Sequence, residues 1–106
     1  MQNPVVPKQV DVVVLTKNSE HLLERCLKST YQNVPVNSLI VIDGYSTDRT
    51  LQILNNFQVK YGNVAVFQME GSRAKARTEG IQRVSTDWFM FVDSDVILCK
   101  NWFERA

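Results

Sequence analysis

The sequence predicts an α/β domain built on a doubly wound, mostly parallel sheet. Four short apolar runs, at 10–15, 38–42, 63–67 and 88–92, are typical of strands that are buried on both faces of a parallel sheet. The segments between these runs carry apolar residues at helical spacing. Strands that alternate with helices predict the order β-α-β-α-β-α-β with right-handed crossovers. In a sheet wound in this way we expect the strand order 3-2-1-4.

Each of the three predicted helices has a stripe of residues that would share one face. The stripes are Leu22, Leu23, Cys26, Leu27 and Tyr31 in the first helix, Leu51, Leu54, Phe57 and Tyr61 in the second, and Ala74, Arg77, Ile81 and Val84 in the third. We expect Ser19 to cap the first helix, the second to open at 46–48, and the third to follow Ser72 with Gly80 weakening it. After the fourth strand, 95–98 predicts a further short strand, and 101–104 predicts the first turn of a helix.

Composition and charge restrict the function classes. The 106 residues are 44% hydrophobic and 22% charged with a net charge of +1, which indicates a soluble globular domain. So small a net charge gives no general attraction for nucleic acid, and we expect no such partner. Residues 1–9 are interpreted as an extended lead-in, and no run is long enough to span a bilayer. We expect a cytoplasmic protein, or one held at the cytoplasmic face of the membrane by other segments or partners. Cys26 and Cys99 match no metal-binding spacing and are expected to be reduced core thiols.

Polar residues follow every predicted strand, at the edge where sheets of this kind bind ligands. Asp93 and Asp95 follow the fourth strand and are one residue apart. Two such carboxylates can converge on Mg²⁺ or Mn²⁺, which takes oxygen ligands and would also bind substrate phosphates. The alternative interpretations are a pair of solvated loop acids or a cap for the next element.

A second group of residues favours a ligand with a phosphate. The third helix is basic, with Arg73, Lys75, Arg77 and Arg83 against a single acid, Glu79, and the N-terminus of that helix adds N–H donors. Arg73 and Arg77 are therefore candidates for holding a pyrophosphate, whereas a solvated helix face is the better interpretation for Arg83. Asp43 ends an apolar strand and can accept hydrogen bonds from a base edge or from ribose hydroxyls. Asp48 is expected to stabilise the start of its own helix.

Four segments together resemble the family 2 inverting glycosyltransferases, whose catalytic domains have the GT-A fold. The segments are VVVLTKNSE (12–20), IVIDGYSTDRT (40–50), AKARTEG (74–80) and FVDSD (91–95). Each is a weak signal alone, but all four stand in the family's order and near its spacing over about 10–105. The resemblance implies transfer of a sugar from a UDP- or GDP-linked donor to an acceptor. Displacement at the anomeric carbon would be assisted by Mn²⁺ or Mg²⁺, which neutralises the departing diphosphate.

The resemblance also implies roles for single residues. Thr16 and Asp43 would contact the nucleobase, and Arg77 would lie near the base or the diphosphate. Asp93 would hold the ribose or the metal shell, and Asp95 would bind the cation. The predicted nucleotide-binding residues are thus Thr16, Asn18, Glu20, Asp43, Arg73, Arg77 and Asp93, and the predicted metal ligands are Asp93 and Asp95. The sequence departs from the family pattern at Lys17, often Tyr or Leu, at Gly44, usually an acid, and at Tyr45, usually Gly.

The carboxylate that would deprotonate an acceptor hydroxyl is expected beyond Ala106. After Asp95 the chain holds one acid, Glu104, which is too close in sequence to take that role. We therefore expect 10–106 to be the nucleotide-sugar-binding half of the domain, truncated before its acceptor half. Two alternatives stay open: a non-enzymatic module of this fold that binds nucleotide or a partner chain, and an Asp-metal nucleotidyltransferase. The loop after the first strand lacks the Gly-rich, basic sequence that is usual in the latter.

The fourth strand predicts self-association. In the order 3-2-1-4 it lies at an edge of the sheet, and 88–92 is apolar on both faces with no Lys or Pro to protect it. We expect a homo-oligomer, by default a symmetric homodimer, built around this strand and the tail at 96–103. The alternative is that Trp102 and Phe103 fold back and cover the edge within one monomer.

Overall fold

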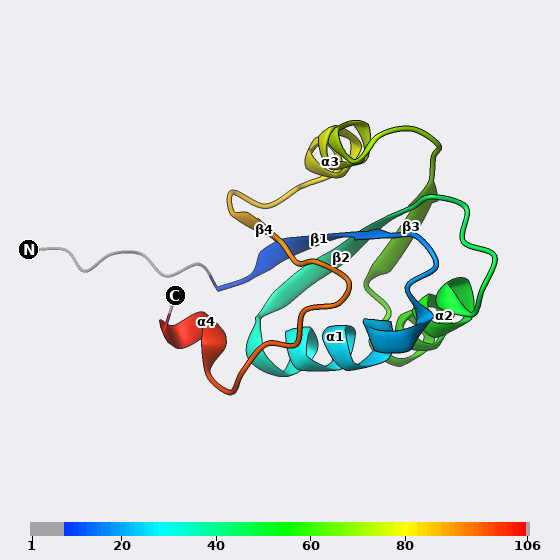
Figure 1. Ribbon diagram of the computed structural model, residues 1–106. Helices are drawn as coiled ribbons and strands as arrows, with labels where there is room; N and C mark the ends of the chain where they lie inside the picture. Colours follow the sequence, from blue (N-terminus) through cyan, green and yellow to red (C-terminus); the bar gives the residue numbers. More distant parts are fainter. Residues whose placement is uncertain (1–7, 106) are drawn as a thin grey trace, which may run out of the picture.

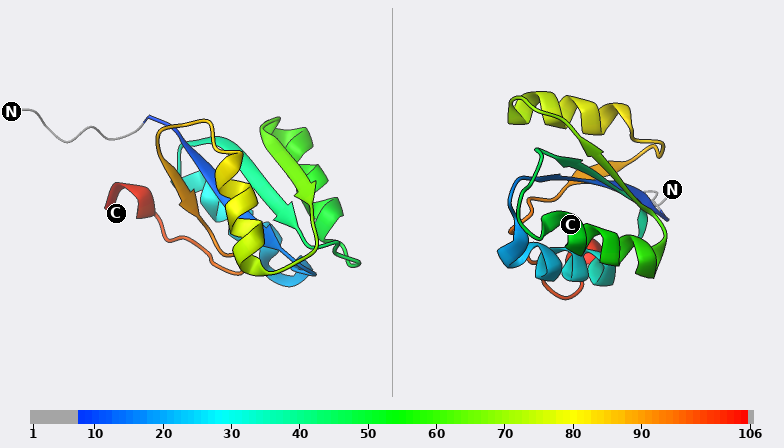
Figure 2. Two further views of the ribbon diagram at one scale, coloured as in Figure 1. Left: turned by 90° about the horizontal axis from the view of Figure 1, so that it is seen from above. Right: turned by 90° about the vertical axis from the view of Figure 1, so that its right-hand side faces the viewer.

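The computed structural model describes residues 8–105 as one four-stranded sheet between two layers of helices (Figure 1). Its strands are β1 (Val10–Thr16), β2 (Val36–Asp43), β3 (Val64–Gln68) and β4 (Phe89–Phe91), and its helices are α1 (Glu20–Asn33), α2 (Thr50–Tyr61), α3 (Arg73–Gln82) and α4 (Trp102–Arg105). The strands pair in parallel in the order β3-β2-β1-β4, which confirms the predicted sheet. Helices α1 and α2 cover one face, and α3 crosses the other (Figures 1 and 2). Most of the predicted lead-in lies outside the described residues.

The core explains why residues 12–15 of β1 form a continuous apolar run. Val12 and Val14 are fully buried against the α1 and α2 side, where Leu23, Leu27 and Leu54 complete the larger cluster. Between them, Val13 faces α3 and is equally buried, in a smaller cluster with Ile40 and Ile42. Because helices cover both faces of the sheet, the successive residues 12–15 of this central strand are all apolar.

Asp11 is a buried acid near the start of β1. Its carboxylate accepts hydrogen bonds from the side chains of Asn37 and Ser38 and from the backbone N–H groups of Ser85 and Thr86. Burial by itself would raise the pKa of this carboxyl, but the hydrogen bonds outweigh it and hold the pKa below its usual value. The ionised side chain thereby fastens the segment before β4 to the start of β1 and β2.

The starts of α1 and α2 are tied together by two acids. Ser19 takes the N-cap position of α1, but its hydroxyl makes no capping bond, contrary to the prediction. The N–H of Glu20 donates instead to Asp48 Oδ2 at 3.2 Å, and Glu20 Oε2 accepts from Arg49 N–H at 3.1 Å. Asp48 Oδ1 also accepts from Thr50 N–H at 2.9 Å, so Asp48 stabilises the start of α2 as predicted, although that helix begins at Thr50 and not at 46–48. Asp48, which is distant in sequence, therefore caps the N-terminus of α1 in place of Ser19.

The residues after β4 also differ from the prediction. The range 95–98 forms no strand: the N–H of Val96 donates to the Asp93 carbonyl at 3.0 Å and closes a turn. Side chains of α1 then form hydrogen bonds with the backbone of Asp93 and Leu98, which a neighbouring strand would otherwise have supplied. Cys26 is buried as expected, and burial raises the pKa of its thiol to about 11, whereas Cys99 is exposed and not a core residue. The predicted helical turn is confirmed as α4.

Helix α3 approaches the sheet most closely at Gly80. A Cβ built on this residue would lie 2.5 Å from Cγ1 of Val13, well inside van der Waals contact. The expectation that Gly80 only weakens the helix therefore misses its role, which is to let the α3 backbone lie directly on β1. None of the helices within 8–105 combines the length and the apolar character needed to cross a bilayer.

Replacing Gly80 with alanine is expected to lower the free energy of unfolding by about 1–2 kcal/mol, because overpacking outweighs the better helix propensity of alanine. Urea denaturation measures the change. Thr78→Ala, at an exposed position of the same helix, is the control. The loss in the double variant Val13→Ala/Gly80→Ala should be smaller than the sum of the two single losses, because the smaller side chain at position 13 makes room for the added methyl group. A Gly80→Ala protein at least as stable as the parent would contradict the close approach.

Candidate active site

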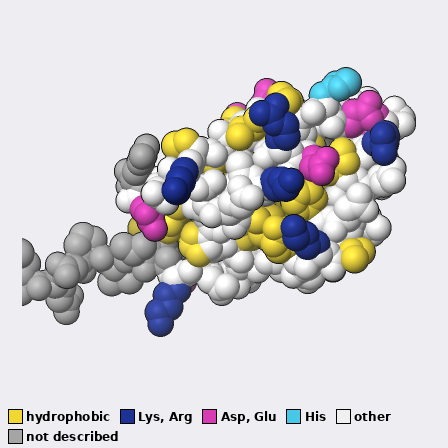
Figure 3. Space-filling view, turned by 90° about the horizontal axis from the view of Figure 1, so that it is seen from below, with side chains coloured by type: hydrophobic (Ala, Val, Ile, Leu, Met, Phe, Trp, Pro, Cys, Tyr) yellow, Lys and Arg dark blue, Asp and Glu magenta, His cyan; other side chains and the backbone are white. Residues whose placement is uncertain are grey.

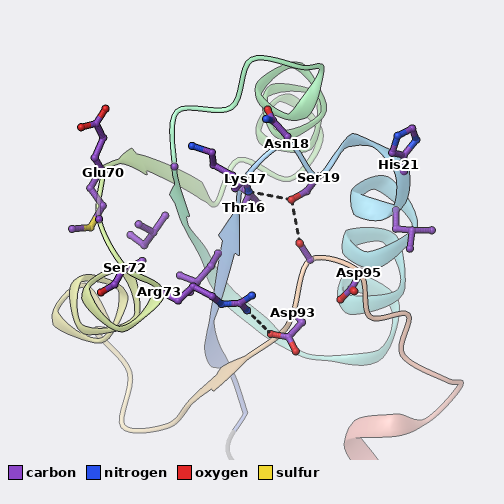
Figure 4. Close-up of a pocket in the computed structure, with 18 residues that line it drawn as sticks. Thr16, Lys17, Asn18, Ser19, His21, Glu70, Ser72, Arg73, Asp93 and Asp95 are labelled. Atoms are coloured by element: carbon purple, nitrogen blue, oxygen red, sulfur yellow. Dashed lines mark hydrogen bonds and ion pairs between the residues drawn. The ribbon is translucent and has the colours of Figure 1, made fainter.

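A cleft of about 890 Å³ opens at the carboxyl ends of the parallel strands (Figure 4). The segments after β1, β3 and β4 and the first turn of α1 form its walls, while Leu15, Ile42 and Ala76 contribute apolar surface. Its polar lining residues are Thr16, Lys17, Asn18, Ser19, His21, Glu70, Ser72, Arg73, Asp93, Ser94 and Asp95. Parallel strands deliver their following loops to one edge, so residues far apart in sequence meet here.

Arg73 and Asp93 face each other across the cleft. Figure 4 shows the Arg73 side chain reaching from the start of α3 toward the segment after β4, with Nη2 at 3.7 Å from Asp93 Oδ1. The two side chains are 72% and 62% exposed, so the ion pair is screened by water and contributes little to stability. Both charged groups are therefore available to a ligand that enters between them.

The carboxylates of Asp93 and Asp95 suit a divalent cation that is shared with a phosphate ligand. Within residues 8–105, no group of three or more His, Cys, Asp or Glu side chains is arranged to hold a metal ion. Mg²⁺ is commonly bound by one or two carboxylates, and substrate phosphates and water complete its octahedron. The donor set of the cleft fits a cation of this kind, and it does not fit a site made by protein ligands alone.

Asp43 lies beneath the cleft and not in its lining. Its buried carboxylate accepts four hydrogen bonds: Thr16 Oγ1 and Ser46 Oγ donate to Oδ1, both at 2.6 Å, and Ser46 N–H and Gln68 Nε2 donate to Oδ2 at 2.8 and 3.1 Å. Burial would raise the pKa of Asp43, but these bonds prevail and hold the pKa below its usual value. The ionised carboxylate thereby orients Thr16, which does line the cleft.

Other predicted site residues lie in three different settings. Asn18 lines the cleft, but its Oδ1 accepts from the N–H of Thr47 at 2.8 Å and so holds the loop after β2. Its φ of 47° is left-handed, a conformation that Asn tolerates better than most residues. Glu20 points to the start of α2, and Arg77 is exposed on α3, and neither is among the lining residues. The cleft therefore brings together Thr16, Asn18, Arg73, Asp93 and Asp95 from the predicted set.

Three ionisable lining residues, Lys17, His21 and Glu70, were not predicted as site residues. Lys17 directly follows the end of β1, and Glu70 comes two residues after the end of β3; this position after a strand is the signal that could have identified them. His21 is the single histidine of the sequence. It is exposed at one end of the α1 side of the molecule (cyan in Figure 3), and it also lines the cleft. On this face of the molecule basic and acidic side chains are interspersed (Figure 3).

Two departures from the family pattern are coupled in space. The side chain of Lys17 crosses the backbone at Gly44, where a Cβ would lie 2.9 Å from Lys17 Cδ. A larger residue at position 44 would have to push the lysine aside. The absence of a side chain at Gly44 therefore gives Lys17 its place on the cleft wall.

A comparison with known families decides what kind of domain carries this cleft. The model of the family described as "Glycosyl transferase family 2" matches residues 11–106. The chain belongs to glycosyltransferase family 2. The poly(ribitol-phosphate) beta-glucosyltransferase of Bacillus spizizenii is 34% identical to it over 93 residues, which are 82% of this chain and 15% of that protein.

Solved glycosyltransferase structures have the same fold as this family 2 domain. The crystal structure of S. aureus TarS matches it with a TM-score of 0.80 and 31% identity, over 92% of this chain and 30% of that one. A mannosyltransferase from Pyrobaculum calidifontis matches at 20% identity with a TM-score of 0.73, over 90% of this chain and 29% of that one, and shows the common GT-A fold. The chain spans between 15% and 40% of the length of the first three curated relatives. Family membership therefore concerns the segment that contains the cleft.

Proposed function

We propose that this chain forms the donor-binding part of a glycosyltransferase that transfers a sugar, with inversion, from a UDP- or GDP-linked donor to an acceptor. The observation that carries the proposal is the cleft of a family 2 domain in which Arg73 faces Asp93 and Asp95 also lines the wall, at the ends of parallel strands. A site with two carboxylates and a positively charged arginine suits a ligand that combines a diphosphate with a divalent metal ion.

The residues that line the cleft would take different parts in binding a nucleotide sugar. Asp95, with Asp93, would hold Mn²⁺ or Mg²⁺, which when bound neutralises the negative charge of the departing diphosphate. Arg73 and the N-terminus of α3, which the Ser72 hydroxyl caps at Lys75 N–H, offer positive charge and N–H donors to phosphate oxygens. Apolar surface at Leu15 and Ile42 and the hydroxyl of Thr16 suit the flat ring and polar edge of a nucleobase.

Two structures of this fold support the choice of ligand. The Pyrobaculum mannosyltransferase was solved with GDP-Man and Mn²⁺, and GalNAc-T7, which is 21% identical with a TM-score of 0.77, was solved with UDP, GalNAc and Mn²⁺. At these identities the likeness is one of fold, so the assignment of ligands in this chain rests on Asp93, Asp95 and Arg73 themselves.

Calorimetric titration of UDP and GDP into the protein, with and without Mn²⁺, tests the proposal. We expect one of the two nucleotides to bind, weakly, and only when Mn²⁺ is present, because the cation screens the repulsion between diphosphate and carboxylates. Absence of binding would favour a module that engages only a partner chain. Preferred binding of a nucleoside triphosphate, with release of pyrophosphate, would favour the nucleotidyltransferase alternative.

We further propose that the protein self-associates through β4. The strand lies at the sheet edge, and Phe89 and Phe91 are 39% and 40% exposed as an edge-to-face pair with ring centroids 5.6 Å apart. Trp102 and Phe103 do fold back, and they pack against the core cluster on the α1 side of the sheet. Side chains alternate between the two faces of a strand, so Phe89 and Phe91 lie on the opposite face from Met90, which also packs on the α1 side. The folded-back residues therefore do not cover the two Phe rings. The edge and its aromatic pair favour pairing with a second copy.

Sedimentation at micromolar concentration is expected to show a dimer for the parent and a monomer for Phe91→Lys, because a charge would then occupy the apolar contact. Val59→Lys, at a 79% exposed position on α2, is the matched control and should leave the dimer intact. A folded parent that sediments as a monomer would refute the proposal.

A further inference from the structure

The sheet does not determine where the two cleft aspartates lie. Strand β4 has three residues, and its last pair joins Phe91 to Val13. The N–H of Val92 still donates to the Val13 carbonyl at 3.0 Å, but Asp93 and the residues after it have left the ladder. Other contacts must therefore hold the turn that carries both carboxylates.

Those contacts come from one side of α1 and the residue before it. The contacting side chains are Ser19, Cys26, Ser29 and Asn33, and we call them the α1 stripe. Ser19 Oγ lies 3.2 Å from Ser94 Oγ, and Cys26 Sγ donates to the Asp93 carbonyl at 3.3 Å. Further along the helix, Ser29 Oγ accepts from Leu98 N–H at 2.9 Å, and Asn33 Oδ1 accepts from Asn101 N–H at 3.0 Å. From position 19 the spacings are seven, three and four residues, which keeps all four on one helix face.

Two members of the α1 stripe act directly on the turn. The Asp93 carbonyl accepts both the N–H of Val96, which closes the turn at 3.0 Å, and the thiol of Cys26. Ser94, between the two aspartates, bonds to Ser19 (Figure 4). Cys26 is fully buried, so its contact is shielded from water. The first two residues of the turn are thus held from α1.

We infer that Cys26 and Ser19 are positioning residues, which hold the turn so that Asp93 and Asp95 are presented together to a ligand in the cleft. The inference rests on the proposed binding of a divalent cation by this pair. Octahedral Mg²⁺ needs its carboxylate oxygens at about 2.0–2.1 Å, so a turn that is free to open presents the two carboxylates less often in the binding arrangement. Cys26 would not touch the ligand, because it acts through the backbone of Asp93.

Amide hydrogen exchange on the metal-free protein tests the structural half of the inference. Cys26→Ala removes the donor to Asp93, and Cys26→Ser restores one. Thr30→Val is the matched control, because Thr30 is also fully buried and its hydroxyl donates to the Cys26 carbonyl at 2.9 Å. Among the described residues, it makes no hydrogen bond to the turn. We expect exchange at Val96 to quicken by about three- to tenfold in Cys26→Ala, in line with the loss of one hydrogen bond. It should stay near the parent value in the other two variants.

Mn²⁺ binding, measured by electron paramagnetic resonance with Mn²⁺ alone and with UDP added, tests the functional half. Cys26→Ala and Ser19→Ala are each expected to weaken Mn²⁺ binding by about three- to tenfold, with Thr30→Val within about twofold of the parent. If Cys26→Ala fails to fold, Ser19→Ala still tests the inference, because Ser19 is only half-buried at the start of α1.

The outcomes separate the inference from the function on which it rests. Unchanged exchange at Val96 in Cys26→Ala would overturn the holding of the turn, and faster exchange with undiminished Mn²⁺ affinity would overturn the positioning role. A parent that binds no Mn²⁺, while Cys26→Ala still speeds exchange, would refute the proposed cation and uphold the control of the turn by α1.

Discussion

Replacing Asp95 with alanine is expected to abolish nucleotide binding that depends on Mn²⁺, with a loss of affinity of about 100-fold or more. The cleft offers two carboxylates to a cation, and within residues 8–105 no third ligand stands ready to replace one of them. Removing Asp95 therefore leaves the metal with a single protein carboxylate beside the positive charge of Arg73. Titration calorimetry with UDP and GDP, in the presence and absence of Mn²⁺, measures the effect.

Asp87→Ala is the matched control for this experiment. Asp87 is an exposed acid in the segment before β4 and does not line the cleft, so the same loss of negative charge there should leave nucleotide binding intact. Asp95→Ala protein that binds nucleotide and Mn²⁺ as well as the parent does would remove Asp95 from the metal site.

Asp43→Ala is expected to cost about 3 kcal/mol of folding stability, because it leaves several buried or half-buried donors without an acceptor. The carboxylate accepts from Thr16 Oγ1, from both the hydroxyl and the N–H of Ser46, and from Gln68 Nε2. Thr16→Val removes one of these donors with little change in shape and should cost only about 1 kcal/mol. Urea denaturation of both variants gives the comparison, and equal losses would show that the network does not depend on Asp43.

The same carboxylate should make stability depend on pH. The pKa of Asp43 in the folded protein is lowered from the ordinary 3.8, so its stabilising effect is fully present above that value and is lost as the pH falls through the lower folded pKa. We therefore expect the free energy of unfolding to fall below about pH 4, and to fall less steeply in Asp43→Ala. Asp11, whose pKa is lowered in the same way, contributes in the same window and keeps part of the slope in that variant. An unfolding free energy that does not change between pH 5 and 3 would contradict both assignments.

Local patterns in the sequence were sufficient for the architecture. Apolar runs report strands buried on both faces, and the alternation with helices leaves few ways to wind the sheet, so the order 3-2-1-4 followed before any contact was known. The same reasoning placed Asp93, Asp95 and Arg73 at one edge, because parallel strands release their following loops on the same side. The ordered motifs also identified the family.

The tertiary structure alone decided what each of these side chains does, because that depends on which groups packing brings within hydrogen-bond reach. Asp43 was predicted to accept hydrogen bonds from a nucleobase, and only the structure shows that Gln68, its neighbour in the β2–β3 pairing, completes a set of four hydrogen bonds to its carboxylate. Gly80 looked like a defect in a helix, and only the distance to Val13 shows why no larger residue fits. Cys26 carries no motif at all, yet α1 places its thiol on the carbonyl of Asp93, 67 residues away in sequence. Contacts between such distant residues are set by how helices lie on the sheet, and no local pattern of residues encodes them.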